Sequence, residues 1–525
     1  MKNSFYLVIP AQQNNPARLK QFEEKALQHW IAQLPTANPS LASRLMHDFI
    51  IEFNALEMEP QNRFVALEAL RPSVQLLEEY LRSRFIKTGF PKEENEKKIF
   101  EVLIAIERHY TIGYWTVLKQ VSQRPSGWFQ GKNTALVIQR CIKGLGRIVA
   151  SHLMMGVVVP DWVWIDLHSL YRLSCKLKKD SSGLIGNLVH ISKVETPEEC
   201  YIRILLLSLA DPTGLMQKEI GLVYRFIKSI THLAVIKQQP VSHQDRQCVI
   251  LADEDRPPYF LPETATAPDS ATLYLDLTRL HKAFEHKAKW VNAAESRFYA
   301  IKGQKIAEDK LPAELLDYLE QRWAGIGLEG VALFADRLDR YIAVGLEPTH
   351  ELQSMSSGKP AKNTEFLVQS ASERLLSCLF EKTGVISVGS LVSFRKADVP
   401  EHRRVLGIVN KIVVAKQYGI NFGIQLLAPF TLAVTYLPLN MGEQDSQQKA
   451  LLFSAKEQNT EKSYLIVDNF MLKDEDILRL FMPRENFPVI LGNKKNIGLG
   501  YWQFECRRLA EKAKTEPEKK GYDFM

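Results

Sequence analysis

Three segments near the C-terminus decide the fold class of this chain: VGSLVSFR (388–395), RRVLGIVNKIVV (403–414) and INFGIQLLAP (420–429). Apolar residues alternate with polar ones, β-branched residues are enriched, and glycine, asparagine and proline bound the segments. This pattern is typical of antiparallel strands joined by short turns. It predicts a small antiparallel β-barrel in this part of the chain.

The N-terminal part of the chain, up to about residue 236, has the periodicity of α-helices instead. Apolar residues recur every three or four positions, as at Phe64, Leu67, Leu70, Val74, Leu77 and Leu81. Pro72 lies inside this run and predicts a kink or a helix boundary near Arg71. The segment TPEE, which begins at Thr196, has the pattern of a capping box and predicts the start of another helix.

These patterns predict an α+β protein with an all-α N-terminal region and a C-terminal antiparallel β-barrel that carries a further β appendage. The predicted parts are an α-helical array (1–236), a mixed connecting region (237–330), the β-barrel (331–440), and a β-rich extension with a charged tail (441–525).

Composition excludes several classes of protein. The net charge of +7 over 525 residues is a mild basic bias, which permits an anionic ligand without predicting DNA or RNA binding. No signal peptide is expected, and the best apolar stretch, 148–165, is broken by His152, Pro160 and Asp161, so we expect no membrane span. The six cysteines contain no CxxC pair, which favours reduced thiols and a cytoplasmic location.

The chain has no motif of a known catalytic or phosphate-binding type. GxSxG, GxxxxGK[ST], HExxH and GxGxxG are all absent. Gly144 and Gly146 lie inside a helical pattern, which favours close helix packing over a phosphate-binding loop. His281 and His286 are five residues apart, a spacing that does not place two metal ligands on one helical face. We therefore predict neither an enzyme nor a resident cofactor or metal.

The basic residues around the predicted barrel allow two interpretations. Arg337 and Arg340 stand just before one strand, and Arg403 and Arg404 stand just before another. Arginine binds phosphate and guanine through paired hydrogen bonds, but arginines at strand ends are also common as solvated surface residues.

The segments RLDRYIAVGLEPTH (337–350), VGSLVSFR (388–395), LGIVNKI (406–412) and FGIQLLAP (422–429) resemble the atypical PilZ family of bacterial cyclic-di-GMP receptors. That family combines an RxxxR segment before its barrel with a [DN]xSxxG segment on a barrel strand. Here the RxxxR segment corresponds to 336–340, with Asp336 at the first arginine position. The second segment corresponds to VQSASERL (368–375), which fits the motif in neither register.

The resemblance implies a cytoplasmic bacterial signalling protein with a PilZ-like barrel, which binds cyclic-di-GMP and relays the signal to an unidentified protein partner. The arginines would hold phosphate or guanine and the serines a guanine edge; the candidate residues are Arg337, Arg340, Ser370, Ser372, Arg403 and Arg404. The alternative hypothesis is an interaction scaffold whose barrel no longer binds nucleotide. Pairing of Arg337 and Arg340 with Asp336 and Asp339 would favour that scaffold. The sequence leaves the oligomeric state open.

Overall fold

The computed structural model describes residues 7–123, 132–180, 195–242, 246–262, 271–292, 307–328, 332–354, 365–415, 419–439, 446–457 and 460–509. Contacts divide the chain into two compact units, each assembled from three segments of sequence. The first unit comprises Met1–Glu329, Leu379–Ser387 and Lys411–Asn421. The second comprises Gly330–Cys378, Val388–Asn410 and Phe422–Met525.

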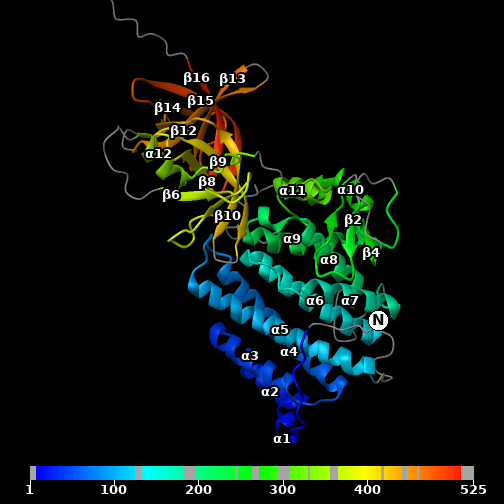
Figure 1. The fold of residues 1–525 in the computed structure, drawn as a ribbon. Coiled ribbons are helices and arrows are strands. Elements are labelled where there is room, and N and C mark those ends of the chain that lie inside the picture. The colour runs from blue at the N-terminus through cyan, green and yellow to red at the C-terminus, as the bar shows by residue number, and fades with distance from the viewer. Residues whose placement is uncertain are drawn as a thin grey trace, which may run out of the picture. The chain divides into compact units, whose positions relative to one another are not determined.

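The first unit is mainly helical. Its α-helices are α1 (Pro16–Leu19), α2 (Glu24–Gln33), α3 (Pro39–Asn54), α4 (Pro60–Phe85), α5 (Glu94–Gln123), α6 (Lys132–Met155), α7 (Val163–Lys176), α8 (Pro197–Leu209), α9 (Gln217–Ile230), α10 (Thr278–Phe284) and α11 (Ala313–Trp323). Helices α4, α5 and α6 lie side by side, with α5 in contact with both neighbours (Figure 1). Helices α8 and α9 pack against α6.

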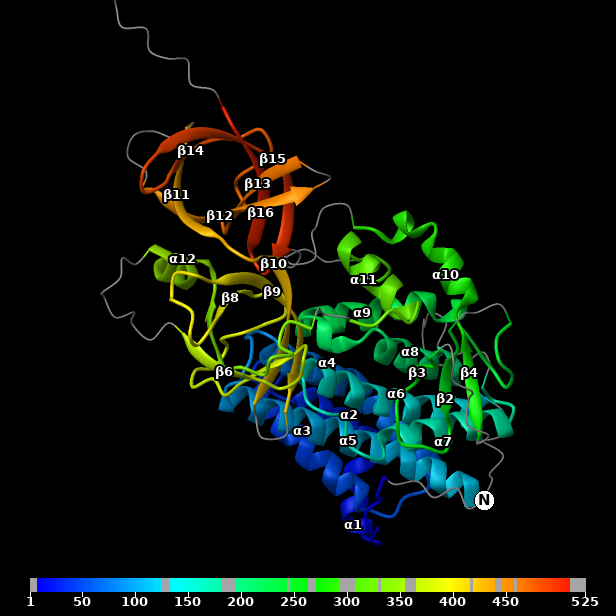
Figure 2. The same cartoon turned by 45° about the horizontal axis from the view of Figure 1, so that its top comes forward.

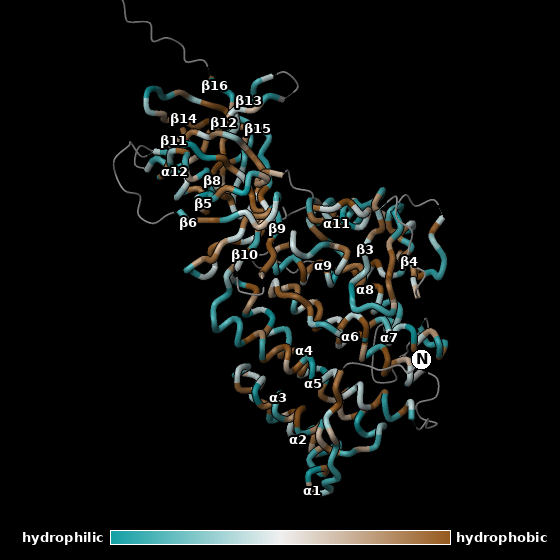
Figure 3. The backbone as a smooth tube through the Cα atoms, viewed as in Figure 1, coloured by the Kyte–Doolittle hydropathy of each residue, from teal (hydrophilic) through white to brown (hydrophobic). Residues whose placement is uncertain are grey.

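The helical core follows the predicted periodicity. Leu67, Leu70, Leu103 and Ile106 are fully buried between α4 and α5, and apolar and polar stretches alternate along these helices (Figure 3). Helix α4 continues through Pro72, so the helix boundary expected near Arg71 does not occur. At α8, Thr196 and Glu199 form the predicted capping box, each accepting from the other's backbone N–H at 3.1 and 2.7 Å.

The first unit also holds a four-stranded antiparallel sheet with the order β1-β4-β2-β3. Its strands are β1 (Val235–Lys237), β2 (Cys248–Leu251), β3 (Tyr259–Phe260) and β4 (Thr272–Asp276). Strand β2 is buried along its whole length.

The second unit contains two closed antiparallel barrels and helix α12 (Leu346–Ser354). The first barrel, in the order β10-β7-β6-β5-β8-β9, is built from β5 (Arg340–Val344), β6 (Phe366–Ser370), β7 (Leu376–Cys378), β8 (Leu391–Lys396), β9 (Val405–Val414) and β10 (Ile420–Ala428), with the far ends of β9 and β10 counted in the first unit. The second, in the order β11-β12-β13-β16-β15-β14, is built from β11 (Leu432–Pro438), β12 (Gln448–Glu457), β13 (Thr460–Val467), β14 (Ile477–Phe481), β15 (Asn486–Gly498) and β16 (Tyr501–Arg508). Figure 2 shows the ring formed by this second barrel.

The structure confirms the predicted fold class, an N-terminal helical region followed by antiparallel β-barrels. The appendage predicted after residue 440 is largely the second barrel, and β11, which lies before that boundary, pairs with β12 and β14. The four domain boundaries themselves stay predictions, and the charged tail at 510–525 lies outside the described residues. All six cysteines are free thiols. Within the described ranges, no helix combines the length and apolarity needed to cross a bilayer.

His168 on α7 makes the stability of the helical unit depend on pH. Its ring is fully buried, with Nδ1 2.6 Å from the hydroxyl of Tyr201 and Nε2 3.0 Å from the carbonyl oxygen of Arg256. Burial lowers the pKa of His168 to about 4 from its usual 6.5. The folded state therefore binds fewer protons than the unfolded state between these values, and stability falls as the pH drops through that window.

We predict that the free energy of unfolding falls by on the order of 3 kcal/mol between pH 6.5 and 4 through His168 alone. Urea unfolding, followed by circular dichroism across this pH range, measures the effect. His168→Gln should make the free energy of unfolding depend less on pH between 6.5 and 4. His286→Gln, at an exposed position, should leave that dependence unchanged. The same pH dependence of unfolding in the natural chain and both variants would contradict the role given to His168.

Candidate functional site

Three segments meet at one end of the first barrel. We call residues 332–339, which precede β5, the arm. The backbone N–H of Phe334 in the arm donates to the carbonyl oxygen of Glu373 in the β6–β7 turn at 2.9 Å. Asp336 in the arm forms an ion pair with Lys396, the last residue of β8, at 2.9 Å. The arm, the β6–β7 turn and the end of β8 therefore share one rim of the barrel.

Arg340 fastens the arm to the barrel. Its guanidinium donates to the carbonyl oxygens of Leu338 and Leu333 at 2.7 and 3.3 Å, and its charge pairs with Asp336 at 2.6 Å. It also donates to Ser370 Oγ on β6 at 3.4 Å. Only 2% of Arg340 is exposed. Its donors are thus occupied by the protein itself, as expected of an arginine that holds a loop in place.

Asp336 carries a stable negative charge at this rim. Hydrogen bonds from Lys396 and then from Arg340 hold the pKa of Asp336 well below its usual range. The carboxylate is therefore ionised at any physiological pH. In the predicted alignment with the PilZ motif it takes the place of an arginine, and its charge is opposite to the one that a phosphate ligand requires.

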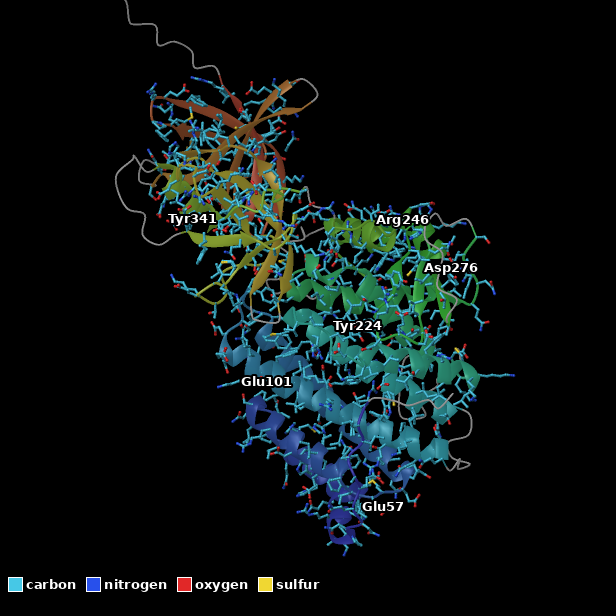
Figure 4. All side chains as sticks on the ribbon, viewed as in Figure 1. Glu57, Glu101, Tyr224, Arg246, Asp276 and Tyr341 are labelled. Atoms are coloured by element: carbon cyan, nitrogen blue, oxygen red, sulfur yellow. The ribbon has the colours of Figure 1, made fainter. Side chains whose placement is uncertain are left out.

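Arg404 is buried in a second ion-pair cluster. Arg404 and Arg395 both pair with the carboxylate of Glu365, and Arg395 lies over the ring of Tyr341 on β5 at 4.7 Å (Figure 4 labels Tyr341). Arg404 also donates to Ser393 Oγ at 2.8 Å. Burial alone would raise the pKa of Glu365, but the hydrogen bonds from the two arginines lower it below its usual value. This cluster joins β5, β8 and β9.

The remaining predicted residues are exposed. Arg337 has a left-handed backbone (φ 55°) and an exposed side chain. Arg403 is exposed beside Arg404. Ser372 uses its hydroxyl oxygen to accept from the backbone N–H groups of Arg374 and Leu375 at 3.2 and 3.1 Å, which stabilises the β6–β7 turn.

The structure thus places Arg340 and Ser370 within hydrogen-bonding distance, in a partly buried contact. Among the described residues, no side-chain partner engages Arg337 or Arg403. The sequence patterns did not single out Glu365 or Lys396. Lys396 follows Arg395 at the end of the predicted strand 388–395, and this basic pair was a signal for it. Within the described ranges, no group of three histidine, cysteine, aspartate or glutamate side chains is arranged to hold a metal ion.

Comparisons with known proteins point to one group of receptors. Residues 25–241 match the family described as the N-terminal domain of the cyclic-di-GMP receptor FimW. The chain is also 22% identical over 564 residues to the cyclic-di-GMP receptor FimW of Pseudomonas aeruginosa, in an alignment that covers 94% of this chain and 92% of that protein. No solved structure matches the chain. The matches support a resemblance to cyclic-di-GMP receptors, and the atypical PilZ assignment stays a prediction.

The Glu365 cluster yields a stability prediction. Glu365→Gln leaves the guanidinium of Arg404 buried without a countercharge, which typically costs about 3–5 kcal/mol. Hydrogen–deuterium exchange should show faster exchange of the amides in β8 and β9. Glu373→Gln, at an exposed turn position, is the matched control and should leave these amides protected. Unchanged protection in Glu365→Gln would show that the cluster does not hold the barrel closed.

Proposed function

We propose that this protein is a cytoplasmic cyclic-di-GMP receptor of the atypical PilZ type, which acts by binding rather than by catalysis. The similarity to a cyclic-di-GMP receptor over 94% of the chain is the observation that carries the proposal. The first barrel and the arm also support the proposal, because they contain the segments that resemble the PilZ family.

In this proposal the ligand contacts the exposed cations of the barrel rim. Arg337 in the arm and Arg403 before β9 have exposed side chains, and Lys396 is 46% exposed beside Asp336. Their charges suit the two phosphates of a cyclic dinucleotide. Arg340 and Ser370 act as positioning residues that hold the arm, and Arg404 holds β9 through Glu365. Ser372 supplies a hydroxyl at the adjacent turn.

The signal would pass to a protein partner through the arm. A ligand that joins the arm to the start of β9 favours one arrangement of the arm over others. The population of that arrangement can rise only as far as the ligand's difference in affinity between the arrangements allows. The partner would recognise the favoured arrangement.

The interaction scaffold is the second candidate, and one observation favours it. Arg340 is paired with Asp336 and buried, as expected if this barrel no longer binds nucleotide. The exposed acids Asp339 and Glu401 also flank the rim and would repel phosphate. In this alternative the same rim docks a protein.

Isothermal titration of the full chain with cyclic-di-GMP tests the proposed function. We expect a micromolar or tighter Kd, which corresponds to about −8 kcal/mol or more favourable. Arg337→Ala and Arg403→Ala should each weaken binding about tenfold or more, because each removes a charge-assisted contact to phosphate. Both side chains are exposed, so these variants should keep the fold.

Arg484→Ala, at an exposed turn of the second barrel, removes the same charge and should bind as the natural chain does. Absence of heat at high protein concentration, together with an unshifted melting curve, would exclude the receptor and favour the scaffold. Binding that is unaffected by either rim variant would keep the receptor but move its site away from the barrel.

A further inference from the structure

Helices α4, α5 and α6 of the first unit enclose a hollow lined by cationic side chains. Arg71 from α4, Tyr110 and Tyr114 from α5, and Arg140, Lys143 and Arg147 from α6 line it. The enclosed part of the hollow has room for about one water molecule, and the wider space of about 270 Å³ includes open solvent. It lies within residues 25–241 and is separate in sequence from every residue of the barrel rim.

The spacing of the cations on α6 places them on one face of the helix. Arg140, Lys143 and Arg147 stand at positions i, i+3 and i+7, which repeat over two helical turns. Gly144 lies on the same face and lets α5 approach closely, because a Cβ at this position would come within 2.2 Å of Thr111 Oγ1. The glycine therefore serves helix packing, and the side chains of its neighbours provide the charge.

Most of these cations are held by carboxylates of neighbouring helices. Arg140 binds Glu68 of α4 through two hydrogen bonds of 2.8 and 2.9 Å. Arg147 pairs with Glu78 of α4 at 3.2 Å. These partners hold the cations in place before any ligand arrives, which lowers the entropic cost of binding.

Further pairs extend this network towards α8 and α5. Lys143 and Arg203 share Glu195, each at 3.2 Å. The guanidinium of Arg203 lies over the ring of Tyr224, which Figure 4 labels on α9. Arg82 pairs with Glu107.

Positive charge is nevertheless in excess. The network comprises six cations, Arg71, Arg82, Arg140, Lys143, Arg147 and Arg203, and four carboxylates, Glu68, Glu78, Glu107 and Glu195. Burial raises the pKa of Glu107 despite its pairing with Arg82.

Arg71 accounts for one of the two charges in excess, and the other arises because Lys143 and Arg203 share Glu195. Within the described part of the chain, no carboxylate lies within ion-pairing distance of its guanidinium, and Glu68, three residues earlier, is engaged by Arg140. Arg71 is partly buried. Burial, and then repulsion from Arg140, lower its pKa. A partly buried cation of this kind is stabilised when an anion enters beside it.

The tyrosines give the hollow a polar but uncharged wall. Tyr110 donates to the carbonyl oxygen of Leu67 at 2.7 Å, and Tyr114 donates to Glu68 at 2.6 Å. Their hydroxyl oxygens lie 3.0 Å apart. Both hydroxyl groups are thus already engaged, so the donors left for a ligand are those of the cations.

We propose that the hollow between α4, α5 and α6 is an anion site that binds a phosphate group, with Arg71, Lys143 and Arg147 as its donors. This goes beyond the proposed function and does not depend on it, because none of these residues belongs to the barrel rim. Arginines that present several N–H donors to one point are the usual receptors for phosphate oxygens.

The size of the hollow limits how much of a ligand it takes. The enclosed part of the hollow has room for about one water molecule, so the phosphate group would lie at its opening to solvent, between the cations that line it. Pockets that enclose a whole drug-sized ligand measure about 300–1,000 Å³. The hollow therefore binds one phosphate, either free or at the end of a nucleotide whose remainder lies outside.

Isothermal titration of the full chain with inorganic phosphate, at constant ionic strength, tests the site. We expect saturable binding that weakens as salt rises, because the attraction is electrostatic. Arg71→Gln should raise the Kd about tenfold or more. The variant should fold, because it leaves no buried carboxylate without a partner. Lys143→Gln is a second variant, since Arg203 still holds Glu195.

Arg84→Gln is the matched control. Arg84 is an exposed arginine on the same helix as Arg71, so the variant makes the same charge change away from the hollow. A control is essential because phosphate stabilises most folded proteins by exclusion from their surfaces. Equal responses to phosphate in the natural chain, Arg71→Gln, Lys143→Gln and Arg84→Gln would overturn the proposal.

Competition identifies the source of the phosphate. If cyclic-di-GMP displaces phosphate and Arg71→Gln weakens its binding, the site takes a phosphate of that nucleotide. If phosphate binds in the presence of saturating cyclic-di-GMP, the site takes a free phosphate or another phosphate ester. The double variant Arg337→Ala/Arg403→Ala separates the two proposals, because it should abolish rim binding and leave phosphate binding intact.

Discussion

Buried charge is the constraint on which the helical unit depends. Helices α4, α5, α6 and α8 contribute charged side chains to the layer between them, and each charge taken from water must find a partner or cost several kcal/mol. The pair of Arg140 with Glu68 links α4 to α6 across a gap of 72 residues in sequence. Helices held by such pairs cannot slide or rotate without exposing a charge, so the register of the whole layer is fixed.

Local patterns predicted the fold because the spacing of apolar residues shows which face of each helix or strand is buried. The alternation in 388–395, 403–414 and 420–429 corresponds to β8, β9 and β10, which end within a few residues of the predicted bounds. The glycines at 144 and 146 serve helix packing as expected. At Pro72, where the sequence predicted a kink or a boundary, the structure contradicts only the boundary. Surrounding contacts keep α4 helical there, and packing on both sides of the proline outweighs the one lost hydrogen bond.

The candidate sites were harder to predict because they depend on pairs that are distant in sequence. Arg404 looked like an accessible ligand residue, but Glu365, 39 residues away, occupies it. The substitution of Asp336 for the motif arginine was visible, and the structure gives its consequence: the carboxylate neutralises Arg340. The cations of α6 were also visible at helical spacing. Their proposed role in binding an anion also depends on Arg71 of α4. That residue lies beside them only because α4 and α6 both pack against α5.

The two units share the chain in an interleaved way that limits how they can be separated. The polypeptide passes from one unit to the other at five places, after residues 329, 378, 387, 410 and 421. No single break in the gene could therefore separate the helical unit from the barrels, since Leu379–Ser387 and Lys411–Asn421 would leave with the wrong half. Expressing either unit by itself would therefore require joining three separate segments of the sequence.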